Sequence, residues 1–141
     1  MSKFKFGTRS ELRLRGVKDP LVRVARLALS KSETDLTIVE GMRSRARQQE
    51  LYAKGRTAPG PKVTWTLNSK HCTGDAIDIA PLKADGSIDW DNQAAFKEMA
   101  RLMFEAASEL GVKLRWGADW DMDGIPYEKG EYDGPHFELV D

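Results

Sequence analysis

The stretch SKHCTGDAIDIAP, residues 69–81, carries an acid inside an apolar run that ends at a proline. We predict a short β-strand over DAIDIAP, residues 75–81, because apolar and polar side chains alternate along it. Ile77 and Ile79 would point to one face of a sheet, and Asp78 to the other. This carboxylate therefore need not be a buried charge without a partner.

The stretch PHFELV, residues 135–140, repeats the pattern near the C-terminus. Phe137 and Leu139 would face one side of a strand, and His136 and Glu138 the other. Two strands that each have an apolar and a polar face predict a sheet with a core on one side. The polar side chains would then share the open face.

The remaining segments complete an α+β pattern. The helix over 91–111 is the clearest, since apolar side chains recur at helical spacing and Gly111 can end it. We predict a small, mostly antiparallel sheet with helices packed on one face. The predicted helices are 19–32 with Asp19 as N-cap, 44–55 capped by Ser44, and 91–111, whose apolar stripe is Phe96, Met99, Met103, Ala106 and Leu110. The further strands are 35–43, with Leu36, Ile38 and Glu40 on one side, and 112–117. Residues 56–70 are predicted to form a long loop.

Length and composition limit the class of protein. The chain has 141 residues, 40% hydrophobic and 31% charged, which is typical of one soluble globular domain spanning 1–141. No apolar run approaches the roughly 20 residues that a membrane-spanning helix needs, and no secretory signal is visible. Cys72 is the only cysteine, which excludes a disulfide framework and a Cys-rich zinc finger; we interpret it as a small filler residue.

Charge is unevenly distributed although the net charge is zero. Residues 1–62 hold 15 Lys and Arg against 6 Asp and Glu, and residues 63–141 hold 7 against 16. A basic half favours an anionic partner, such as nucleic acid or a bacterial envelope. The alternative is that the two halves intermix in the fold and the asymmetry fades.

The two histidines, each expected on the polar face of a strand, and the acid at position 78 have the composition of a metal site. His71, Asp78 and His136 would supply two imidazoles and one carboxylate, and zinc accepts both kinds of donor. A catalytic zinc has three protein ligands and one open position, which activates water. Asp133, three residues before His136 across a turn, can lie beside the metal and act as general base and acid. Structural roles for the histidines remain the alternative.

Two motifs resemble those of a known family. SKHCTGDAIDIAP resembles the Ser-x-His-x-x-Gly-x-Ala-x-Asp motif of zinc D-Ala-D-Ala peptidases, with Ser69, His71, Gly74, Ala76 and Asp78 in the motif positions. YDGPHFELV resembles the second motif of that family, an acid three residues before the last histidine. Together with FKFGTRSE, IVEGMRS and LRWGADW, the likeness covers nearly the whole chain. It is greatest to short phage endolysins that are L-alanyl-D-glutamate endopeptidases.

The resemblance implies a fold, a metal and residue roles. The fold would be that of D-Ala-D-Ala peptidases and hedgehog-like domains, with zinc held by His71, Asp78 and His136 on the open face of the sheet. Asp133 would be the catalytic acid and base. Arg43 would meet a carbonyl or carboxylate of the substrate, which suits a guanidinium fork; a surface arginine is the alternative, and Arg45 and Arg47 are near neighbours. We also expect Ser69 to contact the substrate.

One acidic stretch suggests a second cation. Asp119, Asp121 and Asp123 alternate in ADWDMDG, residues 118–124, like the first half of a calcium-binding EF-hand loop. Gly130 stands where the bidentate Glu belongs, so any Ca²⁺ affinity would be low. A polar turn without calcium is the alternative.

These observations lead to one functional hypothesis and its rivals. We expect a zinc metallopeptidase that cleaves the peptidoglycan stem peptide, at the L-Ala–D-Glu bond, and lyses bacteria. A D-Ala-D-Ala carboxypeptidase or dipeptidase on the same fold is the alternative, and a non-catalytic zinc-containing binding module or a nucleic-acid binder are rivals from other classes. We expect a monomer without a wall-binding domain, nucleic-acid partner or stable membrane insertion. It would be made in the host cytoplasm and act on the wall after the membrane is permeabilised.

Overall fold

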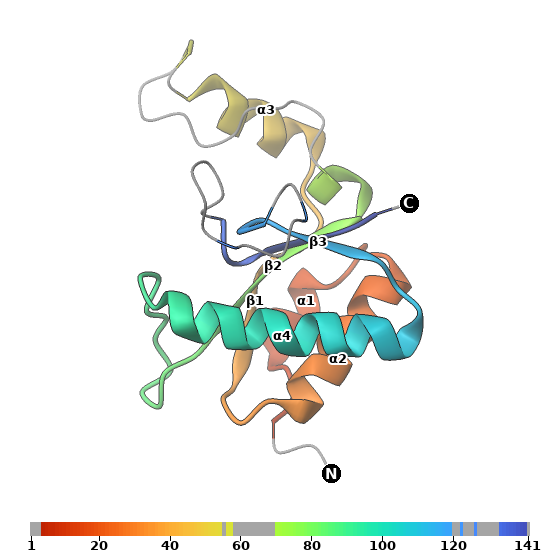
Figure 1. The fold of residues 1–141 in the computed structure, drawn as a ribbon. Coiled ribbons are helices and arrows are strands. Elements are labelled where there is room, and N and C mark those ends of the chain that lie inside the picture. The colour runs from red at the N-terminus through yellow and green to blue at the C-terminus, as the bar shows by residue number, and fades with distance from the viewer. Residues whose placement is uncertain are drawn as a thin grey trace.

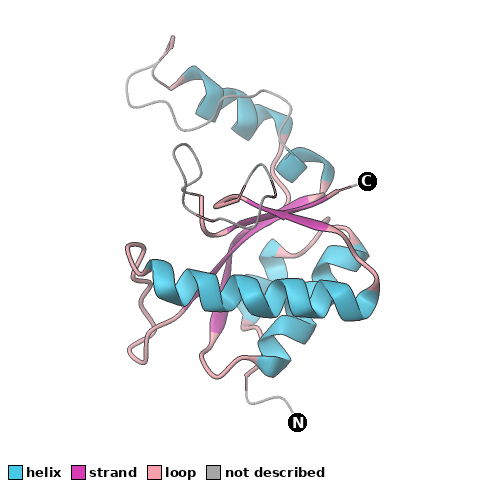
Figure 2. Cartoon of the chain, viewed as in Figure 1, coloured by secondary structure: helices cyan, strands magenta, loops and turns pink. Residues whose placement is uncertain are grey.

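The computed structural model describes residues 4–54, 56–57, 70–119, 122, 126 and 133–140. Helices and strands are interspersed along the chain (Figures 1 and 2). The elements are α1 (Thr8–Arg13), α2 (Asp19–Lys31), β1 (Leu36–Glu40), α3 (Arg45–Ala53), the 3₁₀ helix η1 (Lys70–Thr73), β2 (Ala76–Pro81), α4 (Gln93–Leu110), β3 (Leu114–Trp116) and β4 (His136–Leu139).

Within the described residues, four strands form one sheet in the order β1-β2-β4-β3, and every neighbouring pair is antiparallel. On its core face, Ile38 is opposite Ile79 and Ile77 is opposite Phe137. These four side chains are fully buried. The α+β class and the antiparallel sheet predicted from the sequence are therefore confirmed.

The helices divide between the two sides of the sheet. In Figure 1, α1, α2 and α4 lie on one side, and α3 with η1 lies on the other. Helices α2 and α4 pack against each other, while α1 contacts β1 and α4 contacts β2. The prediction that helices pack on one face of the sheet therefore holds for α1, α2 and α4, which enclose the core. Helix α3 lies on the side that carries the polar residues.

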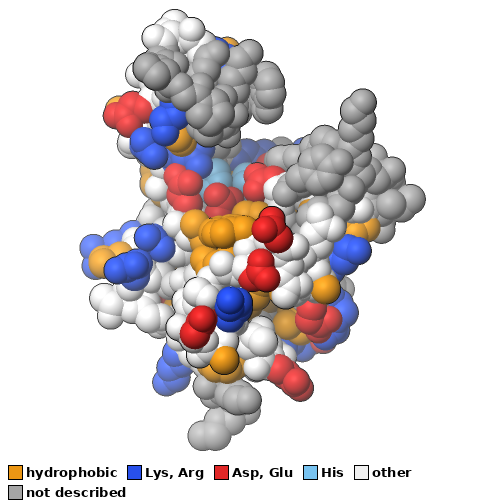
Figure 3. Space-filling model, turned by 90° about the vertical axis from the view of Figure 1, so that its left-hand side faces the viewer, with side chains coloured by type: hydrophobic (Ala, Val, Ile, Leu, Met, Phe, Trp, Pro, Cys, Tyr) orange, Lys and Arg blue, Asp and Glu red, His pale blue; other side chains and the backbone are white. Residues whose placement is uncertain are grey.

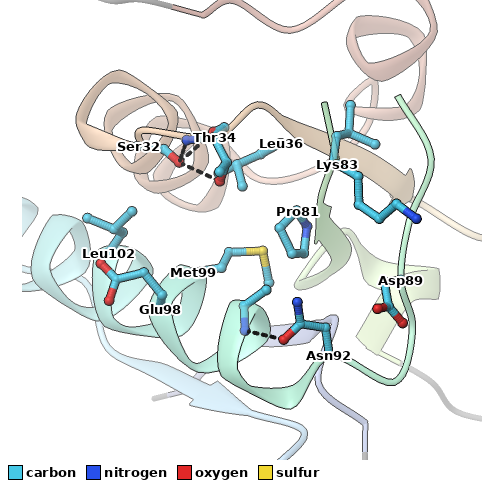
Figure 4. A pocket seen from close by; sticks show the side chains of 12 residues that line it. Ser32, Thr34, Leu36, Pro81, Lys83, Asp89, Asn92, Glu98, Met99 and Leu102 are labelled. Carbon is cyan, nitrogen blue, oxygen red and sulfur yellow. Dashed lines mark hydrogen bonds between the residues drawn. The ribbon is translucent and has the colours of Figure 1, made fainter. Parts of the chain in front are cut away.

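Local sequence signals explain the start of α3 and both ends of α4. The side chain of Ser44 caps α3 by accepting from the Arg47 N–H at 3.1 Å, as predicted. Asn92 caps α4 through the Ala95 N–H at 3.1 Å (Figure 4), and Gly111 ends this helix in the left-handed conformation.

Two predictions about helix residues were wrong. Asp19 is the first residue of α2 and Lys18 is its N-cap, so Asp19 contributes a negative charge in the first turn and lies 3.2 Å from Arg23. Leu110 is 36% exposed, because the apolar stripe of α4 leaves the core before the last turn.

A β-bulge changes which face one acid occupies. Ile38 is opposite Ile79, but Glu40 is opposite Asp78, so the register of β1 shifts between Ile38 and Glu40. Strict alternation predicted Glu40 on the core face together with Ile38, and that prediction was wrong. The extra residue in the bulge rotates Glu40 to the face that carries Asp78.

The basic and acidic parts of the sequence meet in the fold. Lys31 lies 2.8 Å from Glu109 and 3.2 Å from Glu105, and Lys18 lies 2.8 Å from Asp75. These contacts favour the interpretation that the two charge-biased halves intermix. Among the described residues, no helix has both the length and the apolar character needed to cross a bilayer.

Candidate active site

His71 comes from η1, a 3₁₀ turn immediately before β2. The expectation that His71 lies on the polar face of a strand was wrong, because the chain turns at Lys70–Thr73 before β2 begins. The side chain is 3% exposed, and its Nδ1 lies 2.9 Å from the Gly41 carbonyl oxygen. With Nδ1 donating to this carbonyl, Nε2 is left to face Asp78 at 3.3 Å.

Asp78 and His136 are brought together by strand pairing. They are directly opposite each other in β2 and β4, on the same face of the sheet. His136 Nδ1 lies 3.3 Å from Asp78 Oδ1. The rings of His71 and His136 meet edge to face, with centroids 5.1 Å apart. The three residues predicted from the sequence as ligands therefore converge.

The donor atoms of these three residues fit a metal ion. One ligand atom from each of His71, Asp78 and His136 lies within 4.8 Å of the other two. Asp78 Oδ1 is buried and has no hydrogen-bond partner among the described residues, although two imidazole nitrogens lie 3.3 Å away. A buried carboxylate oxygen is costly when unsatisfied. Two nitrogens and one oxygen around a common point form a donor set that suits zinc.

A carboxylate that the sequence analysis did not single out orients the second histidine. Glu138 Oε1 lies 2.8 Å from His136 Nε2, so Nδ1 is the nitrogen directed to the ligand cluster. Glu138 is 5% exposed and lies 3.3 Å from Lys70 and 3.7 Å from Arg115. The two-residue spacing from His136 placed Glu138 on the polar face, and this signal would have identified it.

Charge in the cluster shifts its titration in the metal-free protein. Burial would raise the pKa of Asp78, but the two neighbouring imidazoles hold it well below its usual range. Burial would lower the pKa of His136, but Asp78 and Glu138 raise it to about 9. The negative charges of Asp78 and Glu138 therefore lie next to the histidines, and they favour a cation at the site.

Asp133 is held beside the cluster by the turn that precedes β4. The backbone N–H of His136 donates to the Asp133 carbonyl at 3.2 Å, and Trp116 Nε1 donates to the Gly134 carbonyl at 2.7 Å. Gly117 permits this approach, because a Cβ there would lie 2.8 Å from Asp133 Cβ and 2.9 Å from His136 Cβ.

The environment of Asp133 suits proton transfer. Its side chain retains access to solvent. The surrounding protein nevertheless desolvates the carboxyl and raises its pKa, and the negative charge of Asp78 acts in the same direction. A carboxyl with a raised pKa holds a proton more readily near neutral pH.

Arg43 lies next to the cluster and is held in a fixed orientation. Its Nε and Nη2 donate to the two carboxylate oxygens of Glu40 at 2.6 Å each, and Nη1 donates to Gln48 Oε1 at 2.6 Å. The Arg43 side chain is 11% exposed, and its backbone N–H donates to the His71 carbonyl at 2.8 Å. By contrast, Arg47 pairs with Glu50 on the surface. The geometry thus favours Arg43 over Arg47.

Other predicted site residues do not join the cluster or fall outside the described residues. Ser69, Asp121 and Asp123 are outside them, so the substrate role of Ser69 and the calcium site stay predictions. Asp119 lies in a turn, where its carbonyl accepts from the Met122 N–H at 3.1 Å. Cys72 directs its sulfur toward the Ser44 carbonyl, 3.9 Å away, and is not among the possible metal ligands of the described chain.

Comparison with known sequences gives consistent results. A family model described as phage L-alanyl-D-glutamate peptidase matches residues 1–140. The L-alanyl-D-glutamate peptidase of Escherichia phage T5 is 45% identical over 140 residues, which cover 97% of this chain and 98% of that protein. The peptidoglycan L-alanyl-D-glutamate endopeptidase CwlK of Bacillus subtilis is 38% identical over 120 residues, which cover 80% of this chain and 65% of CwlK.

Solved structures show the same fold. The L-Ala D-Glu endopeptidase ChiX of Serratia marcescens superposes with a TM-score of 0.78 at 36% identity, covering 98% of this chain and 92% of ChiX. The vancomycin-resistance D,D-dipeptidase VanXYg superposes with a TM-score of 0.53 at 23% identity, covering 88% of this chain and 50% of that one. The latter likeness concerns the fold alone.

The fold and the end-to-end likeness to L-alanyl-D-glutamate peptidases from a phage and a bacterium define a peptidase. Within that class, the chain belongs to the family of phage L-alanyl-D-glutamate peptidases, since the family model covers it almost from end to end.

Proposed function

We propose that this chain is a zinc-dependent endopeptidase that hydrolyses the L-Ala–D-Glu bond of the peptidoglycan stem peptide. The observation that carries the proposal is the convergence of His71, Asp78 and His136 on one point, with Asp133 on the adjoining turn, in a chain of this family. Such a combination of ligands and an independent carboxyl is typical of hydrolytic metal sites.

His71 Nε2, Asp78 Oδ1 and His136 Nδ1 would hold the zinc ion. A bound zinc would supply Lewis acidity, polarising the scissile carbonyl and lowering the pKa of water at the site. The protein prepares the ligands for this role, because Gly41 fixes the ring of His71 and Glu138 fixes that of His136. Such outer partners set the tautomer and the direction of each imidazole.

Asp133 would move the proton during hydrolysis. Its ionised carboxylate accepts a proton from the attacking water, and its protonated form then donates to the nitrogen of D-Glu that leaves. The raised pKa supports the second step, because it keeps the proton available until the amine departs.

Arg43 would bind the developing negative charge or a substrate carboxylate. Three of its five N–H donors are committed to Glu40 and Gln48, and within the described part of the chain two donors on the terminal nitrogens are left over. The committed donors fix the plane of the guanidinium before the substrate arrives. A preoriented donor of this kind costs little reorganisation when charge develops.

The substrate and its location follow from the same proposal. Peptidoglycan lies outside the cytoplasmic membrane, so the protein would act as an endolysin after the membrane is permeabilised. The stem peptide presents carboxylates from D-Glu onward, and Arg43 offers them a cation at the site.

Mass spectrometry of digested, purified peptidoglycan tests the bond. We expect fragments with a new N-terminal D-Glu and complementary fragments that end in L-Ala. Metal analysis of the active protein, followed by chelation and restoration with Zn²⁺, tests the ion. Release of D-Ala alone would refute the L-Ala–D-Glu assignment, and full cleavage by metal-free protein would refute the metal mechanism.

A further inference from the structure

A cavity of about 410 Å³ opens beside Asp133. Its lining joins the turn before β4 to the segment that leads into α4, so it adjoins the catalytic carboxyl directly. The lining residues are Trp90, Asp91, Gln93, Phe96, Asp133, Gly134 and Pro135.

Trp90 gives this cavity a fixed aromatic wall. The side chain is 53% exposed, yet its ring stacks on Phe96 with centroids 6.1 Å apart and an angle of 22° between the planes. Phe96 is 2% exposed and belongs to the core, so it anchors the indole. Figure 3 views the end of the molecule where α4 begins; hydrophobic side chains gather there next to acidic ones and a histidine.

The position of the proposed scissile bond limits what can occupy this cavity. In peptidoglycan, L-Ala is joined through its amino group to the lactyl group of N-acetylmuramic acid. Only one residue therefore separates the L-Ala–D-Glu bond from the sugar, and one extended residue spans roughly 3.5 Å. A sugar must then lie close to the catalytic groups whenever the intact wall is cleaved. The cavity offers such space, because Asp133 is part of its wall.

Charge distinguishes the two ends of the substrate. The D-Glu side carries carboxylates, which Asp91 and Asp133 would repel and Arg43 would attract. The muramic acid ring is uncharged once its lactyl group is in amide linkage. A flat indole can cover the C–H face of a pyranose, while Asp91 and Gln93 can bind its hydroxyl and acetamido groups.

We propose that this cavity is a subsite for the N-acetylmuramic acid that carries the stem peptide, with Trp90 as its platform. The inference rests on the proposed function and adds a sugar to the substrate recognised. Another cavity, of about 250 Å³ beside Met99 and Pro81, has no lining residue in common with the catalytic site (Figure 4). It is therefore not a candidate for the same ligand.

The test compares two soluble substrates that differ only in the sugar. One is the stem tripeptide L-Ala-D-Glu with its third residue, acetylated at the N-terminus; the other has N-acetylmuramic acid at that position. The readout is the ratio of kcat/KM for the sugar-bearing and the sugar-free peptide. This ratio does not depend on the fraction of each preparation that is folded.

We expect the wild type to prefer the sugar-bearing peptide roughly tenfold, the scale of one good aromatic contact. Trp90→Ala should bring the ratio close to one, and Trp90→Phe should retain part of the preference because it keeps a flat ring on Phe96. Leu12→Ala is the control, since Leu12 is similarly exposed (52%) but lies on α1. It should keep the wild-type ratio.

Three results would overturn the subsite. One is equal cleavage of both peptides by the wild type. Another is a loss of the same factor on both peptides in Trp90→Ala, which would assign Trp90 a purely structural role. The third is an unchanged preference for the sugar-bearing peptide in Trp90→Ala, which would place the sugar away from this cavity. Failure of the wild type to cleave either peptide would instead refute the proposed function.

Discussion

The two faces of the same strands serve different purposes. On one face of β2 and β4, Ile77, Ile79 and Phe137 are completely buried in the apolar core. On the other face, Asp78 and His136 are also largely buried, at 19% and 9% side-chain exposure, but they are polar. Burial therefore does not distinguish core from site in this protein. The difference is that apolar side chains satisfy one another by packing, whereas the polar ones require specific partners.

Most of those partners come from outside the two central strands. Gly41 follows β1 and fixes His71; Lys70 in η1 and Arg115 in β3 lie near Glu138. The core face can tolerate changes of side-chain shape at a modest cost in stability. The site face cannot, because each removed partner leaves another polar group unsatisfied. The following predictions test this contrast.

The largest effect is expected at one of the three proposed metal ligands. His71→Ala should abolish peptidoglycan hydrolysis and remove bound zinc, because only one imidazole and one carboxylate would remain. The stabilisation that added zinc gives the wild type should disappear as well, since metal binding is linked to folding. Metal analysis and thermal unfolding with and without Zn²⁺ measure both. Retention of stoichiometric zinc by this variant would exclude His71 as a ligand.

The next effect concerns the proton. Asp133→Asn should lower kcat by about 10²-fold to 10⁴-fold, the usual contribution of a positioned acid or base. Zinc content and unfolding temperature should stay close to those of the wild type, because Asp133 is not among the three converging ligands. Asp85→Asn, in an exposed turn, is the control. A metal-free Asp133→Asn protein would mean that Asp133 binds the metal itself.

A smaller effect is expected at the carboxylate behind His136. Glu138→Gln keeps a hydrogen-bond acceptor for His136 Nε2 but removes the negative charge that faces Lys70. We expect zinc affinity to fall by about 10-fold to 100-fold, as for other residues that orient a ligand. Competition with a chelator measures this. Glu98→Gln, at an exposed ion pair on α4, should leave the affinity unchanged.

The pH dependence of zinc binding provides the second arm of that experiment. In the metal-free protein, the pKa of His136 is raised from 6.5 to about 9. Protonated His136 therefore stabilises the folded protein below about pH 6.5, and this stabilisation is lost as the pH rises through about 9. Zinc requires the neutral imidazole, so affinity should fall about tenfold per pH unit below that value. Glu138→Gln should move this dependence to lower pH. A dependence identical to the wild type would show that Glu138 does not act on His136.

A still smaller effect is expected at the bulge in β1. Glu40→Gln weakens the fork that orients Arg43, and we expect kcat/KM to fall by about tenfold, the value of one charged hydrogen bond. If Glu40 acts through Arg43, the same substitution in an Arg43→Ala background should cost nothing further. Glu50→Gln, which loosens the surface pair with Arg47, is the matched control. An equal loss in both backgrounds would assign Glu40 a separate role.

Some residues of this site were predictable from the sequence and others were not, because the sequence patterns that indicate position differ in reliability. Alternation along β2 and β4 predicted the faces of Asp78 and His136, because their pairing is regular. The same rule misplaced Glu40, since a bulge is set by three-dimensional fit and leaves no fixed sequence pattern. It also assigned His71 to a strand, whereas a 3₁₀ turn holds it. Short turns of this kind have weak sequence signals.

Tertiary contacts that join distant segments were not predictable. Nothing in the sequence showed that Gly41 would accept from His71, thirty positions away, or that Trp90 and Asp133 would line one cavity. Helix α1 was also missed, because six residues are too few for a clear helical period. The resemblance to a family supplied the proposed ligand set, and the structure added the residues that orient its two histidines.

The smallest effect on activity is expected on the core face. Ile79→Val removes one methylene beside Asp78, from a side chain that is 0% exposed and opposite Ile38. The free energy of unfolding should fall by about 0.5–1.5 kcal/mol, the usual cost of this deletion. Zinc affinity and kcat per folded molecule should remain those of the wild type, because Ile79 points away from the metal ligands while the backbone of β2 keeps its register. Urea unfolding of the metal-free protein, with metal titration and kinetics at low temperature, separates the two quantities. Should this conservative change lower zinc affinity as much as Glu138→Gln does, the two faces would be mechanically coupled and the contrast between core and site would fail.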